Sequence, residues 1–131
     1  MSQQEMEIVL SRNFAEQLAT AVFIVNPSGD LVYYNEPAEK LLGTSFKETG
    51  SMSSDEWGTK FHPVDQNGES IPPEELPLLI AITKRQPAHN IFWIVDLDGN
   101  LREIEVTALP LIGRSGSLAG GMAIFWERSR E

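Results

Sequence analysis

The sequence predicts a single-domain α+β fold, and three observations support this prediction. A chain of 131 residues with 41% hydrophobic residues suits one core. Short runs rich in β-branched and aromatic residues, each bounded by turn residues, predict two strands near residues 21–34 and three after residue 88. Helical spacing or helix-capping residues occur before and between these runs. The predicted order is therefore helix, two strands, short helices, a longer helix and three strands.

The first segment, residues 1–18, is predicted to be a helix that caps the domain or contacts a second copy. Ser2 and Glu5 have the spacing of a capping box. An apolar stripe follows at helical spacing. Its members are Met6, Val9 or Leu10, Phe14 and Leu18. The stripe either packs on its own domain, residues 19–128, or pairs with the stripe of another chain.

A hairpin and a short helix are predicted next. The strand "AVFIV" leads through the turn "NPSGD" to a second strand at residues 31–34. Asn35 is suited to cap the next helix, Pro37 has no amide that would lack a partner in the first turn, and Gly43 is suited to the left-handed C-cap. The predicted helix therefore runs from Glu36 to Leu42.

Residues 44–72 are the least regular part, and a longer helix follows them. Ser53 with Glu56 predicts a capped turn of helix, and "DQNGE" predicts a tight turn. The segment Glu74–Arg85 has acidic residues in its first turn and basic residues in its last, an arrangement that complements the helix dipole. The residues expected to face inward are Leu76, Leu79 or Ile80, and Thr83.

The last part of the chain is predicted to be all strand. The segments 88–96 and 101–111 flank an Asp-Gly pair, which is the strongest hairpin signal in the chain. Alternation places Ile104, Val106 and Ala108 on one face. The closing strand is apolar on both faces, so its outer face requires a cover. One face has Gly121, Ala123 and Phe125, where small residues leave room, and the other has Met122, Ile124 and Trp126.

These segments resemble a PAS domain over residues 16–128. The stretch "VFIVNPSGDLVYYNEPAEKLLG" resembles the first hairpin and short helix of that family, and "LDGNLREIEVTALPLIG" with "GGMAIFWE" resembles its last three strands. The stretch "NGESIPPEELPLLIAITKRQP" resembles a segment of many bacterial PAS sensors. The resemblance implies a five-stranded antiparallel sheet with short helices across one face. It also implies a cavity between them, which either binds a ligand or is filled by side chains.

Two sets of candidate site residues follow. The cavity is expected to be lined by Phe23, Val25, Trp57, Phe61, Ile104, Val106, Ala108, Ala123 and Phe125. Alternatively, Trp57, Phe61 and Phe46 fill it. A homodimer interface is expected at Met6, Val9, Leu10, Met122, Ile124 and Trp126.

Several chemistries are disfavoured, and no catalytic residue or metal site is predicted. The chain has no Cys, which excludes thiol-adduct flavin photochemistry and a thioester-linked chromophore. His62 is the only plausible haem ligand, because His89 begins a strand, so haem is unlikely. Acidic pairs such as Glu74 with Glu75 are explained by helix starts, turns and solvated strand faces. The ligand, if there is one, is not identified by any residue.

Charge and hydropathy limit the partners. A net charge of −9 without a basic patch disfavours nucleic-acid binding. No membrane span or secretory signal is found, so a cytoplasmic location is expected. The resemblance implies a sensory module of a larger signalling protein, such as a histidine kinase, and the alternative is a constitutive dimerisation module. Where the family commonly has an Asp-x-Thr motif that couples to the effector, this chain has Glu127, Arg128 and Ser129.

Overall fold

The computed structural model describes residues 3–96 and 98–128. The helices are α1 (Gln3–Glu16), α2 (Glu36–Leu42), α3 (Phe46–Thr49), α4 (Ser54–Lys60), the 3-10 helix η1 (Pro73–Glu75) and α5 (Pro77–Lys84). The strands are β1 (Ala21–Val25), β2 (Leu31–Tyr34), β3 (Ala88–Val95), β4 (Leu101–Ile112) and β5 (Leu118–Glu127). No helix in these ranges is long and apolar enough to cross a membrane.

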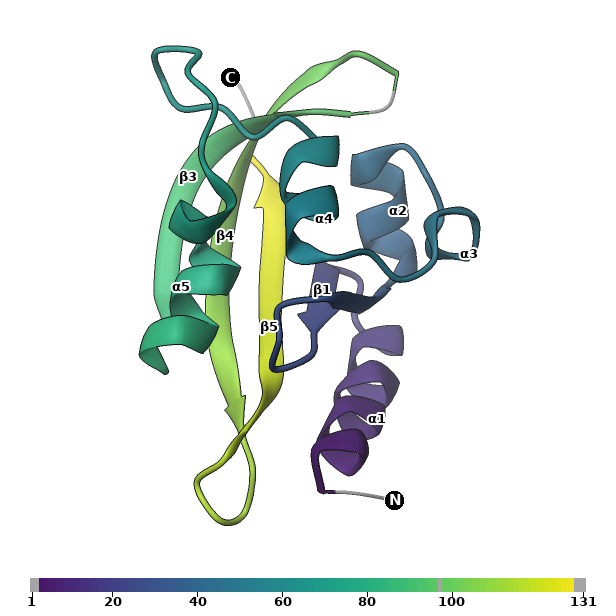
Figure 1. The fold of residues 1–131 in the computed structure, drawn as a ribbon. Coiled ribbons are helices and arrows are strands. Elements are labelled where there is room, and N and C mark those ends of the chain that lie inside the picture. Colours follow the sequence, from purple (N-terminus) through teal and green to yellow (C-terminus); the bar gives the residue numbers. More distant parts are fainter. Residues whose placement is uncertain (1–2, 97, 129–131) are drawn as a thin grey trace.

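The five strands form one antiparallel sheet in the order β2-β1-β5-β4-β3 (Figure 1). The closing strand β5 is therefore central and pairs with both β1 and β4. The predicted α+β fold with a five-stranded antiparallel sheet is confirmed.

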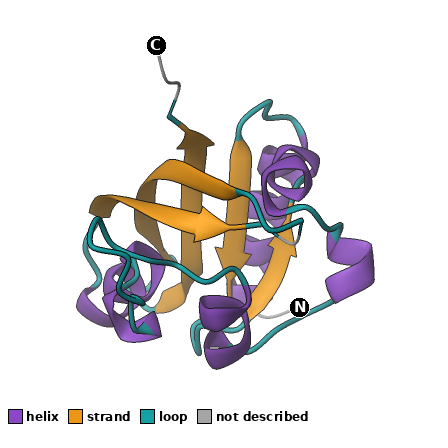
Figure 2. Cartoon of the chain, turned by 90° about the horizontal axis from the view of Figure 1, so that it is seen from above, coloured by secondary structure: helices purple, strands orange, loops and turns teal. Residues whose placement is uncertain are grey.

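Each face of the sheet has its own apolar core, and helices lie on both sides of it (Figure 2). The larger core contains side chains of α2, α4 and α5 together with the inner face of the sheet. The smaller core contains Ala15 of α1 with Val22, Ile24 and Met122. The outer face of β5 is thus partly covered by the chain's own first helix.

Helix α1 docks through a different stripe from the one that the spacing predicts. Its contacts with the sheet involve Ile8 and Ala15, and Leu18 joins the same core just after the helix. Apart from Leu18, the predicted stripe faces solvent instead. Its exposed fractions are 49% for Met6, 41% for Val9, 56% for Leu10 and 55% for Phe14. Of the two alternatives for the stripe, packing on its own domain is therefore wrong for these four residues, and pairing with a second copy stays a prediction. The predicted cap at Ser2 lies outside the described residues.

The local signals around α2 and α4 are confirmed. Asn35 caps α2 by accepting a hydrogen bond from the Ala38 amide, and Gly43 ends the helix with φ +84°. Ser53 caps α4 by accepting from the Glu56 amide. The N-terminal ends of both helices are set by side chains that satisfy free amides of the first turn.

The predicted helix Glu74–Arg85 is wrong in its first turn. Residues 73–75 form a separate 3-10 turn, and α5 begins only at Pro77. Pro77 lacks an amide hydrogen and disfavours helical geometry in the residue before it, and Leu76 is accordingly extended, with ψ +142°. Leu76 is buried as expected, whereas Thr83 is exposed.

Two glycines in β5 allow helices to approach the sheet. A Cβ at Gly121 would lie 2.6 Å from Cγ2 of Ile82 and 3.0 Å from Cδ1 of Leu78, both in α5. A Cβ at Gly120 would overlap the carbonyl oxygen of Val25 on the neighbouring strand, and it would also lie 3.0 Å from Cδ1 of Ile8 in α1, on the opposite face. The expectation that Gly121 leaves room is therefore wrong, because α5 occupies that space.

Candidate functional site

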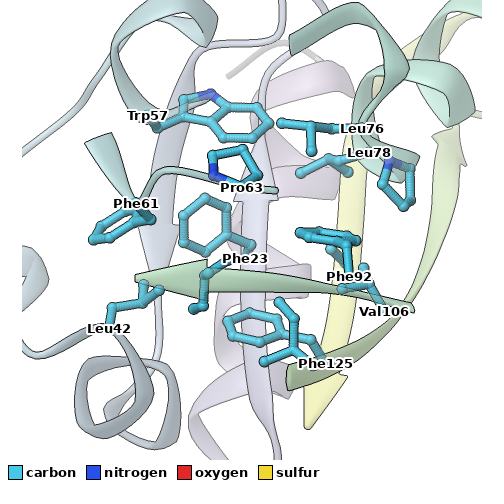
Figure 3. Close-up of a pocket in the computed structure, with 14 residues that line it drawn as sticks. Phe23, Leu42, Trp57, Phe61, Pro63, Leu76, Leu78, Phe92, Val106 and Phe125 are labelled. Atoms are coloured by element: carbon cyan, nitrogen blue, oxygen red, sulfur yellow. The ribbon is translucent and has the colours of Figure 1, made fainter. Parts of the chain in front are cut away.

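An apolar cavity of about 80 Å³ lies between the inner face of the sheet and the helices (Figure 3). Strands β1, β3, β4 and β5 form its floor, and α2, α4, α5 and the segments beside them form its walls. Every lining residue is apolar and buried. The lining residues are Phe23, Leu42, Trp57, Phe61, Pro63, Leu76, Pro77, Leu78, Phe92, Ile94, Ile104, Val106, Ala123 and Phe125.

The structure brings most of the predicted cavity residues together. Val25 and Ala108 belong to the same core but do not line the cavity. The other predicted residues line it, namely Phe23, Trp57, Phe61, Ile104, Val106, Ala123 and Phe125. Sequence reasoning missed Phe92 and Ile94, although alternation along β3 could have placed both on the inner face. Ligand binding by this set stays a prediction.

Aromatic rings form much of the cavity wall without filling the space. The ring of Phe23 lies edge-on to Trp57 at 5.6 Å and edge-on to Phe125 at 5.9 Å between centroids. Figure 3 shows these rings with Phe61 and Phe92 arranged around a common space. Phe46 does not take part, because it packs on Tyr33 and Tyr34. The expectation that Phe46 helps to fill the cavity is therefore wrong.

Among the described residues that line the cavity, none has a polar side-chain group without a partner. The only side-chain hydrogen-bonding group among the lining residues is the indole N–H of Trp57, and it donates to the Gly29 carbonyl oxygen at 2.9 Å. His62 lies between the lining residues Phe61 and Pro63, but its side chain is exposed and does not line the cavity. This placement gives no axial ligand for haem inside the cavity.

The backbone beside the cavity wall is strained at His62. Its φ is +45°, in the left-handed region that side chains rarely adopt. A non-glycine residue held there costs about 1–3 kcal/mol, and such strain is often found beside ligand sites. The strained residue separates two residues of the cavity wall, Phe61 and Pro63.

A second group of side chains joins the end of β5 to the β3–β4 turn. Arg102 donates from Nε to Oδ2 of the buried Asp96 at 2.8 Å and from Nη1 to Oε1 of Glu127 at 3.0 Å. The hydrogen bond from Arg102, aided by the backbone amides of Asn100 and Asp98, holds the pKa of Asp96 below its usual range. The same contact with Asp96 raises the pKa of Arg102.

The outer face near the end of β5 has charged pairs beside an exposed aromatic side chain. Nη1 of Arg128 lies 3.6 Å from Oε2 of Glu103, and Nε2 of His89 lies 2.8 Å from Oε2 of Glu105. Trp126 is 39% exposed. Within the described residues, no group of three or more His, Cys, Asp or Glu side chains is placed to bind a metal ion.

Comparison with solved structures identifies the fold as the PAS fold. The PAS domain of the fruit-fly ELK potassium channel has a TM-score of 0.74 at 8% identity, with 94% of this chain and 98% of that chain covered. A PAS domain from Colwellia psychrerythraea has a TM-score of 0.61 at 15% identity, with 95% and 99% covered.

A longer chain also contains the fold. An RNA-binding light-oxygen-voltage receptor has a TM-score of 0.68 at 18% identity, with 97% of this chain but 34% of that chain covered. No protein-family model matches the sequence, and no curated protein matches it. The chain thus has the PAS fold, and the likeness to these proteins is one of fold.

Replacing Asp96 with Asn tests the ion pair through its pH dependence. Asn keeps an oxygen that accepts from the amides of Asp98 and Asn100 but loses the charge that faces Arg102. We expect the free energy of unfolding at pH 7 to fall by about 1.5–3 kcal/mol, as for a hydrogen bond between charged groups. Urea unfolding followed by tryptophan fluorescence measures this loss.

The difference in free energy of unfolding between the unmodified chain and Asp96→Asn is expected to shrink in acid. The folded-state pKa of Asp96 is lowered from 3.8, so the stabilisation is complete above that pH. Below it, the unfolded chain binds the proton first, and the contribution is lost as the pH falls through the folded-state pKa. A difference at pH 3 as large as that at pH 7 would contradict this assignment.

Proposed function

We propose that the chain is a sensory module in which a small molecule in the apolar cavity alters β5, and β5 passes the change to an adjoining effector domain. The main support for the proposal is that neighbouring residues of β5 line the cavity and form the surface at the end of the strand. Ala123 and Phe125 line the cavity, whereas Trp126 is exposed and Glu127 pairs with Arg102. The proposal assigns the chain no catalytic step of its own.

The position of β5 in the sheet supports this coupling. A central strand that is displaced must also move its partners, because its backbone pairs with β1 and β4 on either side. The Arg128 amide donates to the Glu103 carbonyl oxygen at 2.9 Å, which continues the pairing beyond the end of the strand. We propose that Glu127 and Arg128 take the place of the start of the Asp-x-Thr motif; Ser129 lies outside the described residues.

Filling the cavity with a larger side chain tests the coupling without a ligand. Ala123→Leu adds volume at the cavity wall, so we expect it to fold and to slow exchange of the amides at 125–128 several-fold, because the end of β5 opens less often. Hydrogen exchange followed by NMR measures this. Unchanged exchange at 125–128 in a stably folded variant would contradict the proposal.

Ala108→Leu is the matched control. Ala108 is the register partner of Ala123 on the same face and is fully buried, but it does not line the cavity. Overpacking at this position is expected to cost about 1–3 kcal/mol and to raise exchange broadly. Ala123→Val serves as a milder filling variant should the Leu variant fail to fold.

A second candidate function is homodimerisation, and the exposed stripe on α1 favours it. Met6, Val9, Leu10 and Phe14 form an apolar surface on a helix whose other side is docked on the sheet. Such a stripe suits pairing with its own copy through a two-fold interface. Ile124 is half-buried and Trp126 exposed on the outer face, whereas Met122 is buried beside α1 and is not available to a partner while α1 is docked.

Charge substitution on this surface tests dimerisation. We expect the unmodified chain to sediment as a dimer, and Leu10→Glu and Trp126→Glu to sediment as monomers in analytical ultracentrifugation, because a buried carboxylate without a partner opposes association. Gln66→Glu makes the same change of charge at an exposed polar position in the turn after α4, outside the proposed interface, and should leave the dimer intact. Homodimerisation through this surface would be contradicted if the unmodified chain sediments as a monomer, or if both test variants still sediment as dimers.

A further inference from the structure

We infer that the cavity selects a small, uncharged, apolar molecule, of about the size of a few carbon atoms up to a benzene ring. The inference rests on the proposed function and adds the chemical class of its ligand. It excludes a flavin, a haem and polar or charged metabolites as occupants of the cavity as it stands.

The polarity of the cavity wall disfavours polar and charged ligands. All lining side chains are apolar, and the one N–H among them, on Trp57, already has the Gly29 carbonyl oxygen as its partner. A polar group that enters this space loses its hydrogen bonds to water and gains none from these side chains. A carboxylate or an ammonium group loses far more, because no side chain of opposite charge lines the cavity.

The size of the cavity limits the ligand to small molecules. Its volume is about 80 Å³. Apolar cavities of about 150 Å³ remain dry and bind benzene or xenon. A cavity of about half that volume suits xenon or a small hydrocarbon directly, and benzene with a slight expansion of the wall. Fused-ring cofactors and long acyl chains need several times this space.

The smallest side chain that lines the cavity, Ala123, leaves the space for the ligand. Ala123 lies on the central strand and is the register partner of Phe23 on β1. The wall around it is made of large side chains, including Trp57, Phe61 and Phe125. The space in front of Ala123 therefore depends on its small size, and a Leu at this position is expected to take the place of the ligand.

Three molecules of the same shape test the inference. Isobutene, acetamide and acetate each have four heavy atoms in one planar branched arrangement, and they differ in polarity and charge. Each is titrated into the full chain while methyl NMR signals of Leu78, Ile104 and Val106 are followed, because the surrounding rings make these signals sensitive to an occupant. We expect saturable shifts with isobutene and none with acetamide or acetate at the same concentrations.

Ala123→Leu is the control for the location of binding. The isobutene shifts should be lost in this variant and kept in Asn13→Glu, whose substitution lies on the exposed side of α1. Ala123→Val, which adds less volume, should weaken binding and keep the response should the Leu variant fail to fold. Shifts that persist unchanged in Ala123→Leu would place the binding elsewhere and overturn the inference.

The remaining outcomes separate the ligand class from the proposed function. Saturable cavity shifts with acetate or acetamide at or below the isobutene concentration, or no shifts with isobutene, would overturn the ligand class. The exchange response of residues 125–128 to Ala123→Leu needs no ligand. If that response is present, the sensory coupling stands although the ligand class has failed; if it is absent, the proposed function fails by itself.

Discussion

The buried side chain of Asn35 connects the two layers of the molecule. Its Oδ1 accepts from the amides of Val22 and Ala38, and its Nδ2 donates to the carbonyl oxygens of Ala15 and Thr20. One side chain therefore fixes the end of α1, the start of β1 and the cap of α2. Because each of these groups is buried or partly buried, loss of the side chain would leave several without partners.

Both helical layers take their positions from this connection. Helix α1 is held with Ala15 against the outer face, so its apolar stripe of larger side chains points to solvent. Helix α2 is held on the other face, where Leu42 reaches the cavity wall. The outer surface proposed for dimerisation and the cavity proposed for the ligand are thus tied to the same residue.

The cavity arises from a change in side-chain size along the inner face of β5. At Gly121 the side chains of α5 lie so close to the strand that they leave no room for a Cβ, whereas Ala123, two residues further, lines the cavity. At Phe125 a large ring bounds the space. The helical layer therefore packs directly on the sheet at Gly121 and leaves a small cavity further along β5.

Sequence reasoning succeeded where neighbouring residues determine the structure. The cap at Asn35, the left-handed Gly43 and the alternation in β4 all follow from local chemistry. The docking of α1 was not predictable in this way, because the helix has two apolar stripes and a distant side chain selects the one with Ala15. Likewise, whether the space beside Trp57 and Phe61 is filled depends on how several elements pack, which no local pattern specifies.

The most direct test of the central claim is a crystal structure of the chain under xenon pressure. Xenon binds apolar cavities because it gains dispersion contacts without needing a hydrogen bond. We expect one ordered xenon atom between Phe23, Phe61 and Ala123, surrounded by the apolar side chains of the cavity wall. A structure in which these side chains meet and xenon binds only elsewhere would contradict it.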